Sequence, residues 1–139
     1  MAYKDLPVRE LDSWQLNYAV AKYVCKHKTR TALHLPHRFY IEEEAFRPVS
    51  RIVDGKVKVE LEPFVKCSYF LPVEHKEFSR PVIERLGLKA YETEEGWACK
   101  VGDFEPFTDF HADIALLRAA VAHSSGSELV LVPLGRVAK

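Results

Sequence analysis

The sequence predicts a single α+β domain in which antiparallel hairpins pack against two main helices and one short helix. Three observations support this class. Apolar residues recur at helical spacing near each end of the chain, hairpin signals lie between these stretches, and the hairpins are segregated from the helices. A length of 139 residues is typical of one domain, so residues 1–139 are assigned to a single one.

The first helix is predicted to begin at Asp12 or Ser13, either of which can act as its N-cap, and to run to about His27. Its apolar positions form two adjacent stripes: Leu16, Val20, Tyr23 and Val24, and Trp14, Tyr18, Ala21 and Cys25. So wide an apolar surface predicts that this helix is deeply buried. Residues 37–41 are then predicted to form a short strand, which ends at three consecutive glutamates.

A hairpin is predicted around Asp54-Gly55, because a type I′ turn needs two residues that accept a positive φ. Its strands cover residues 49–53 and 57–61. The alternation of polar and apolar residues from 56 to 61 places one face of this hairpin in water. A further strand is predicted between Pro63 and Pro72, because prolines favour the ends of a strand ladder.

The second half of the chain predicts a short helix, a second hairpin, a long helix and a final strand. Pro81 suits the first turn of a helix that ends at Gly87. Residues 88–91 and 97–101 are predicted to pair across a glutamate-rich turn, and residues 129–132 form the last strand. The long helix is predicted to start at Thr108 or Asp109 and to end at Gly126. Its buried stripe is predicted to consist of Phe110, Ile114, Leu117 and Val121.

The composition excludes several classes of protein. Twenty Lys and Arg residues balance twenty Asp and Glu residues, so no overall charge attracts nucleic acid or a membrane surface. No apolar run is long enough to span a membrane, and the first residues contain no apolar export signal. Cys25, Cys67 and Cys99 lack paired spacing, which favours reduced, mostly buried thiols. We therefore expect a cytoplasmic protein without a membrane partner that folds without cofactor or metal.

Two histidine patterns suggest chemistry. His34 and His37, or His111 with its neighbouring aspartates, offer metal ligands, but a proline places the first pair on an extended loop. His27 and His123 begin H-x-S/T triplets, like those with which two-histidine phosphoesterases act on one phosphate. Those enzymes carry the triplets on apolar strands, whereas here both lie near the ends of predicted helices. P-loop and nucleophile-elbow motifs are absent, so no catalytic and no metal-binding residue is predicted.

The distribution of charge is more informative than its total. No Asp or Glu lies between Ser13 and Ile41, whereas this segment contains several Lys, Arg and His residues interleaved with aromatic ones. Such a segment can form a basic surface that holds phosphate groups and stacks a base. The alternative is a solvated basic face beside a buried helix, since the aromatics also match core periodicity. Trp14 and Trp97 are likewise interpreted as core anchors.

An arginine also interrupts the apolar centre of the last helix. The guanidinium of Arg118 needs water, a carboxylate or a phosphate there, so it either pairs with an acid such as Glu84 or contacts a ligand. Arg118 and the basic segment together define the candidate site. The predicted ligand-binding residues are Tyr18, Lys22, Arg38 and Arg118.

Three segments resemble the NinX-like family of small phage proteins. They are residues 16–22 (LNYAVAK), 81–85 (PVIER) and 113–133, whose centre reads LLRAAV, and together with residues 96–98 they keep the family's order. The polar or aromatic positions that match the family are Asn17, Tyr18, Lys22, Glu84 and Arg118. The resemblance implies a phage or prophage accessory protein that is made in the bacterial cytoplasm, and it implies no particular activity.

These observations predict a non-enzymatic binding protein. Small phage accessory proteins often bind a host protein or a host signalling nucleotide. The predicted role is therefore sequestration of a nucleotide or another phosphate-bearing small molecule of the host. Two alternatives remain open: a small phosphoesterase or metal-dependent hydrolase, and an inhibitor that binds a host protein. A homo-oligomer is compatible with each of these roles.

Overall fold

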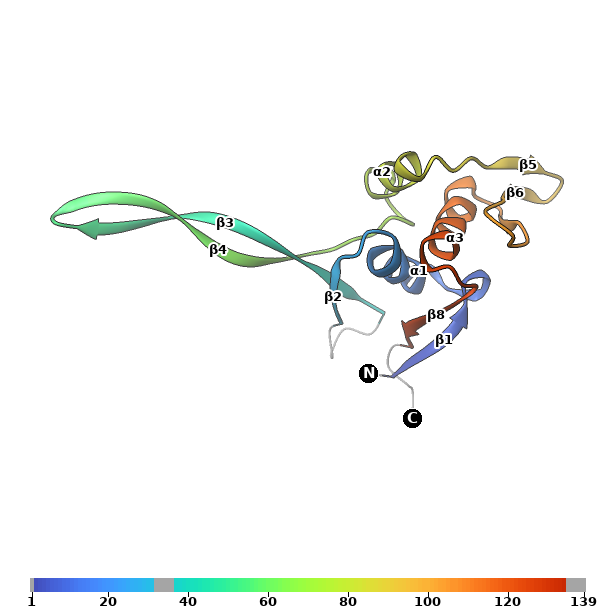
Figure 1. The fold of residues 1–139 in the computed structure, drawn as a ribbon, viewed down its shortest axis with the longest axis horizontal. Coiled ribbons are helices and arrows are strands. Elements are labelled where there is room, and N and C mark those ends of the chain that lie inside the picture. Colours follow the sequence, from blue (N-terminus) through green and yellow to red (C-terminus); the bar gives the residue numbers. More distant parts are fainter. Residues whose placement is uncertain (1, 32–36, 135–139) are drawn as a thin grey trace.

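The computed structural model describes residues 2–31 and 37–134 and confirms the α+β class (Figure 1). Its helical elements are the 3₁₀ turn η1 (Val8–Glu10), α1 (Ser13–Ala19), the π-helical turn η2 (Val20–Val24), α2 (Lys76–Leu86) and α3 (Ala112–Ser125). Its strands are β1 (Tyr3–Pro7), β2 (Lys28–Thr31), β3 (Phe39–Val53), β4 (Lys56–Ser68), β5 (Tyr91–Thr93), β6 (Gly96–Cys99), β7 (Phe107–Asp109) and β8 (Leu129–Pro133). They form three antiparallel sheets, with strand orders β1-β8, β2-β3-β4 and β5-β6-β7.

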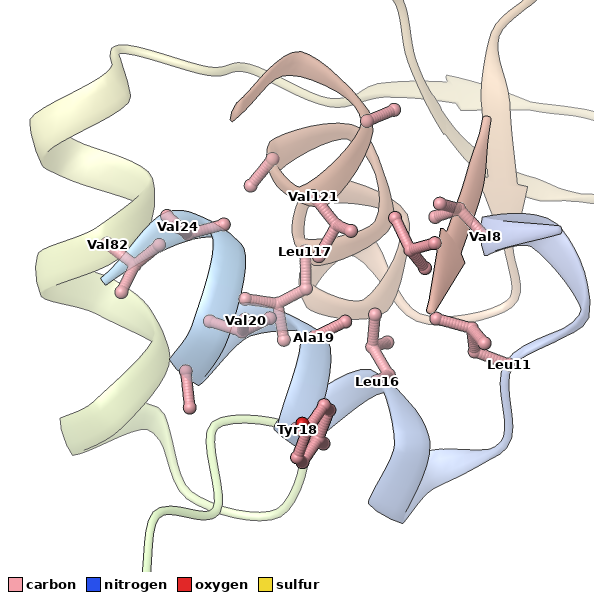
Figure 2. Close-up of a cluster of buried hydrophobic side chains, with 14 of the residues drawn as sticks. Val8, Leu11, Leu16, Tyr18, Ala19, Val20, Val24, Val82, Leu117 and Val121 are labelled. Atoms are coloured by element: carbon pink, nitrogen blue, oxygen red, sulfur yellow. The ribbon is translucent and has the colours of Figure 1, made fainter. Parts of the chain in front are cut away.

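The hydrophobic core lies where α3 packs against α1 and η2 (Figure 2). The part of the molecule built around this core is here called the body. Leu117 and Val121 of α3 belong to one buried cluster with Leu16 and Val20, and none of the four is more than 1% exposed. Complete burial of each such side chain contributes roughly 1.5–3 kcal/mol to stability. The buried side of α3 also carries several alanines, which let neighbouring helices approach closely. In the described ranges, no helix is long and apolar enough to cross a membrane.

The start of α1 and the ends of α2 and α3 follow the predicted capping signals, whereas α2 begins at Lys76, so Pro81 lies inside this helix and not in its first turn as predicted. Asp12 is the N-cap of α1: its carboxylate accepts a hydrogen bond from the Gln15 N–H at 3.0 Å, and Gln15 Oε1 accepts one from the Asp12 N–H at 3.3 Å. This reciprocal pair is a capping box. Gly87 and Gly126 end α2 and α3 with φ of +66° and +71°, a region that favours glycine.

The first helix ends earlier than predicted. After Ala19 the chain continues as η2, in which the Cys25 N–H donates to the Val20 carbonyl at 3.0 Å, five residues back. Lys26, with φ of +59°, then directs the chain into β2 instead of allowing the helix to reach His27.

The start of α3 also differs from the prediction. This helix begins at Ala112 instead of at residues 108–109, because Phe107–Asp109 pair with β6 as strand β7. Phe110 therefore lies before the helix, and its side chain is 81% exposed. The prediction that Phe110 belongs to the core stripe was wrong.

Strands β3 and β4 form a long hairpin, here called the arm, that projects from the body (Figure 1). The predicted turn at Asp54-Gly55 is confirmed, with φ of +54° and +73°. The strands on either side are much longer than predicted, because residues 39–53 and 56–68 are continuous and pair from Ile41↔Ser68 to Val53↔Lys56. Beyond its root the arm packs on neither main helix (Figure 1).

Two strand ends that the sequence predicts, at the glutamates after residue 41 and at Pro63, are absent from the structure. Glu43 and Glu44 remain in β3 because they are exposed to water, so charge carries little cost there. Pro63 lies inside the ladder opposite Phe46. An edge strand tolerates proline where the missing N–H would point away from its partner strand.

The contrast between Leu117 and Phe110 gives a direct test of the core. Leu117→Ala is expected to lower the free energy of unfolding by about 2–5 kcal/mol, because it leaves a cavity between α3 and η2. Phe110→Ala removes a larger side chain, yet an exposed position is expected to change that free energy by less than about 0.5 kcal/mol. Urea denaturation followed by circular dichroism measures both. Equal losses would contradict the placement of Phe110 outside the core.

Candidate ligand-binding site

A cavity of about 390 Å³ lies between α1 and the root of the arm. We call it the Trp14 cavity. Its lining residues come from α1, from the start of β3 and from the segment between β4 and α2: Trp14, Asn17, His37, Arg38, Phe39, Tyr69, Leu71 and Glu74. Small-molecule sites usually enclose roughly 300–1,000 Å³. The volume of the Trp14 cavity therefore suits a small ligand.

A buried amide fixes one wall of the Trp14 cavity. Asn17 is 1% exposed, its Oδ1 accepts a hydrogen bond from the Val73 N–H at 2.8 Å, and its Nδ2 donates to Glu74 Oε2 at 2.8 Å. These two bonds hold the segment after the arm against α1. They engage one oxygen of the Glu74 carboxylate, so the second oxygen is available, among the described residues, to a donor in the cavity.

Trp14 contributes a buried donor that lacks an acceptor. Its indole Nε1 is shielded from solvent and has no hydrogen-bond partner among the described residues. Leaving such a group unpaired costs roughly 1–3 kcal/mol, and folded proteins rarely tolerate it. The Trp14 ring also meets the His37 imidazole at an interplanar angle of 75°, with centroids 5.3 Å apart. Trp14 thus lines the cavity with an aromatic side chain whose N–H lacks an acceptor among the described residues.

The cation of the Trp14 cavity is Arg38. It follows His37, whose φ of +63° lies in the left-handed region that costs residues other than glycine roughly 1–2 kcal/mol. Histidine is among the residues that enter this region more readily. The resulting backbone turn seats the imidazole beside Trp14 and leaves both Arg38 and Phe39 on the cavity wall.

A tyrosine pair stands next to Arg38 at the root of the arm. The rings of Tyr40 and Tyr69 lie 5.1 Å apart. The interaction of their hydroxyls lowers the pKa of Tyr69 and raises the pKa of Tyr40, and the Arg38 guanidinium lowers the pKa of Tyr69 further. The Tyr69 hydroxyl therefore lies beside a positive charge, an arrangement that suits an anionic group.

The Trp14 cavity combines three kinds of contact. Trp14 and Tyr69 provide aromatic surfaces, Arg38 provides a positive charge, and Glu74 provides an oriented acceptor. A ligand that uses all three has a planar ring, an anionic group and a hydrogen-bond donor. Phosphate suits a guanidinium, which offers several N–H donors in a planar fork.

The structure brings some of the predicted site residues together. Arg38 lines the Trp14 cavity. Tyr18 is 3% exposed and lies behind the lining, with its ring centroid 5.5 Å from that of Phe39. The Lys22 ammonium lies 5.7 Å from the Tyr18 ring centroid and 5.6 Å from that of Tyr23, and Lys22 is not a lining residue. Tyr18 therefore supports the cavity wall, and Lys22 lies beyond it.

Arg118 lies elsewhere. Its guanidinium donates hydrogen bonds to the main-chain carbonyls of Val8, Arg9 and Leu11, the last at 3.1 Å. These carbonyls belong to η1 and the turn into α1, so Arg118 ties α3 to the start of the chain. Burial lowers the pKa of Arg118, and the charge of Asp109 raises it in part. Among the described residues, Arg118 forms no ion pair with Glu84, and it does not line the Trp14 cavity.

Neither histidine pattern forms a site in the part of the chain that the structure describes. His34 lies outside that part. His27 packs against Phe70, with ring centroids 5.6 Å apart, whereas His123 is exposed near the end of α3. Within residues 2–31 and 37–134, no three His, Cys, Asp or Glu side chains are grouped so that they would hold a metal ion.

The thiols are free, and one of them is exposed. Cys67 lies exposed on β4, whereas Cys25 is half-buried and Cys99 is buried. Burial raises the pKa of both Cys25 and Cys99, although Arg85 opposes this for Cys25. The expectation of mostly buried thiols therefore holds for Cys99, holds in part for Cys25 and is wrong for Cys67.

A second cavity, of about 260 Å³, lies beside the third sheet. It is lined by Thr93, Glu95, Trp97, Thr108, Asp109 and Phe110. This lining contains two carboxylates and no basic residue, so it disfavours a phosphate group. The Trp14 cavity therefore suits an anionic ligand better than this second cavity does.

Sequence reasoning missed much of the Trp14 cavity. Trp14 was interpreted as a core anchor, and Asn17 appeared only through the family resemblance. Both lie in the acid-free segment with Arg38, and their spacing places them on one face of α1, so a signal for these three existed. Tyr69 and Glu74 come from beyond the arm, and no local pattern links them to the first helix.

Arg118 has a structural role that can be measured. Arg118→Ala is expected to lower the free energy of unfolding by about 1–3 kcal/mol, because the carbonyls around η1 lose a charged donor. Arg118→Lys keeps the charge without the planar fork, so it is expected to restore only part of this loss. Thermal and urea unfolding measure both variants. An Arg118→Ala variant as stable as the wild type would show that this residue does not hold η1.

No protein-family model, curated protein or solved structure matches this chain.

Proposed function

We propose that this protein is a non-enzymatic binding protein that holds a phosphate-bearing small molecule of the nucleotide class in the Trp14 cavity. The observation that carries the proposal is the buried Nε1 of Trp14, which has no acceptor in the described residues and belongs to a side chain that lines a cavity together with the cation Arg38. A ligand acceptor would satisfy this donor. The cost of leaving it unpaired would then be recovered on binding.

The remaining contacts support the same class of ligand. Arg38 and the neighbouring Tyr69 hydroxyl suit a phosphate. Trp14 and Tyr69 offer faces on which a base can stack, and stacking on an aromatic side chain contributes roughly 1–3 kcal/mol per base. The available oxygen of Glu74 suits an exocyclic amino group of such a base.

Binding without turnover is supported by the lining itself. Serine, threonine, cysteine and lysine, four of the residue types that act as covalent nucleophiles, do not occur among the described residues that line the Trp14 cavity. The Glu74 carboxylate is held by Asn17 and is therefore positioned as an acceptor. These features favour retention of an intact ligand over its hydrolysis.

The segments that resemble the NinX-like family support the biological part of the proposal. On this basis the protein acts as a phage or prophage accessory protein in the bacterial cytoplasm. Its role there is to sequester a nucleotide signal of the host. Mass spectrometry of ligand released from the purified protein tests this role, because a sequestering protein yields intact nucleotide and a phosphoesterase yields product.

Two variants that remove one positive charge each locate the site. Arg38→Ala is expected to weaken nucleotide binding at least tenfold, because a charge-assisted hydrogen bond contributes about 1.5–3 kcal/mol. Lys22→Ala is the matched control, since it removes the same charge from the same acid-free segment but outside the Trp14 cavity. It is expected to change the affinity less than about threefold, because salt screens a charge that lies outside the cavity. Calorimetry with linear and cyclic nucleotides measures both.

Two results of this titration would contradict the proposal. One is the absence of binding of any nucleotide to the wild type at millimolar concentration, which would favour a host protein as the partner. The other is an equal loss of affinity in the Arg38 and Lys22 variants, which would indicate a diffuse charge effect without a defined site.

Trp14→Phe tests the unpaired donor. It keeps an aromatic ring and removes the N–H group, so it is expected to weaken nucleotide binding roughly 2- to 12-fold. The stability of the free protein should change by less than about 1 kcal/mol, because loss of an unpaired buried donor offsets the smaller ring. Trp97→Phe serves as the control, since Trp97 lines the other cavity. A variant that loses stability without losing affinity would assign Trp14 to packing alone.

A further inference from the structure

The arm has two chemically different faces. Cross-strand partners in an antiparallel pair point to the same side, and sides alternate along each strand. The observed register therefore places one set of residues, here called the apolar face, on a single side of the arm: Phe46, Pro48, Ser50 and Ile52 of β3 with Val57, Val59, Leu61, Pro63 and Val65 of β4. The other side carries most of the charges of the arm, including the ion pairs Arg47–Glu62 at 3.6 Å and Arg51–Glu60 at 3.5 Å.

Nothing in the described chain covers the apolar face. Its six large aliphatic and aromatic side chains are each 61% to 79% exposed: Phe46, Ile52, Val57, Val59, Leu61 and Val65. The only other strand of this sheet, β2, pairs with β3 no further than Glu42. A two-stranded hairpin is marginally stable in water without something packed against it. The apolar face therefore needs a partner surface.

The edges of the arm are protected against further strand pairing, whereas its apolar face is not. Pro48 and Pro63 lie inside the two strands, where a residue without N–H is tolerated only if that group would point outward. Each strand therefore lacks a donor on its open edge. Proline on an edge strand is a known means of preventing the addition of another strand. The partner must then pack on the face and not on the edge.

We propose that the apolar face is an interface with a second copy of this chain, in which two arms pack face to face about a two-fold axis. The apolar face carries no charged residue from the Phe46–Pro63 pair to the Ile52–Val57 pair, and Glu44, opposite Val65, marks its end at the root of the arm. The part between these pairs complements a surface that is equally uncharged. The same face on a second copy meets this requirement. A two-fold interface is self-complementary and is the commonest arrangement among soluble oligomers.

The area of the apolar face agrees with such a pairing. The six exposed side chains each have roughly 80 Å² of surface to bury, so two faces packed together remove on the order of 1,000 Å² of apolar surface from water. A specific interface is expected to bury at least about 1,000 Å² in total. The two prolines add further apolar area, and Ser50 and the backbone between them add polar area to the total. The arm alone thus presents enough surface for a dimer.

Sedimentation of the full chain over a concentration series tests the interface. One chain has a mass of 15.9 kDa, and the wild type is expected to sediment with twice that mass at roughly 100 µM and to dissociate on dilution. A wild type that keeps the mass of one chain at this concentration would overturn the proposal. No nucleotide is needed, so this result is independent of the Trp14 cavity.

A matched pair of substitutions assigns the interface to one face. Val59→Lys places a charge on the apolar face, whereas Val53→Lys makes the same change on the opposite face of the same arm, where Val53 is 38% exposed. The dissociation constant is expected to rise at least tenfold in the first variant and less than threefold in the second. Equal effects, or an unaffected Val59→Lys dimer, would overturn the proposed face.

Hydrogen exchange provides a second measurement that does not depend on the folding of a variant. In the wild type, amide protection of β3 and β4 beyond the reach of β2 is expected to fall on dilution, while protection of α3 stays constant. Arm protection that does not change between dimeric and monomeric concentrations would contradict packing of the two arms.

Discussion

The packing of α3 against α1 and η2 is the constraint from which the positions of the other elements follow. Leu117 and Val121 are fully buried in this contact, and the alanines of α3 allow the helices to approach. Once α1 is fixed in this way, its inner side belongs to the core and its other side presents Trp14 and Asn17 to the root of the arm. Arg118 adds a polar tie between α3 and the turn before α1. The same helix that completes the core therefore builds one wall of the Trp14 cavity.

The features that could be predicted from the sequence depend on interactions within a few residues. Asp12 caps α1 through Gln15, and the Asp54-Gly55 turn and Gly126 adopt positive φ, because each is determined by its own side chain and its neighbours. Phe110 was misplaced because helical spacing does not reveal that Phe107–Asp109 pair with a strand. The short strands β1, β2 and β7 were missed for the same reason, since each exists only through its partner. The alternation in the arm was seen, but its length was not, because nothing local shows that no helix covers it.

The candidate site shows the same division. The absence of acidic residues from Ser13 to Ile41 singled out Arg38, which lines the Trp14 cavity, and the helix that contains Trp14 and Asn17 lies in the same segment. Arg118 was grouped with them on chemical grounds, yet its guanidinium is directed to main-chain carbonyls. The acceptor Glu74 reaches Asn17 across 57 residues of sequence, most of which form the arm. Such a contact follows from the fold and has no local signature.

We infer that the indole N–H of Trp14 donates a hydrogen bond to an acceptor of the bound nucleotide. The chain contains two tryptophans, so a ¹H–¹⁵N spectrum contains two indole signals, and the Trp14→Phe variant identifies which belongs to Trp14. Saturation with a bound nucleotide is predicted to move the Trp14 indole proton downfield, as expected when a hydrogen bond forms, and to leave the Trp97 signal unchanged. A Trp14 signal that stays in place while a nucleotide is bound, or a shift confined to Trp97, would contradict the account.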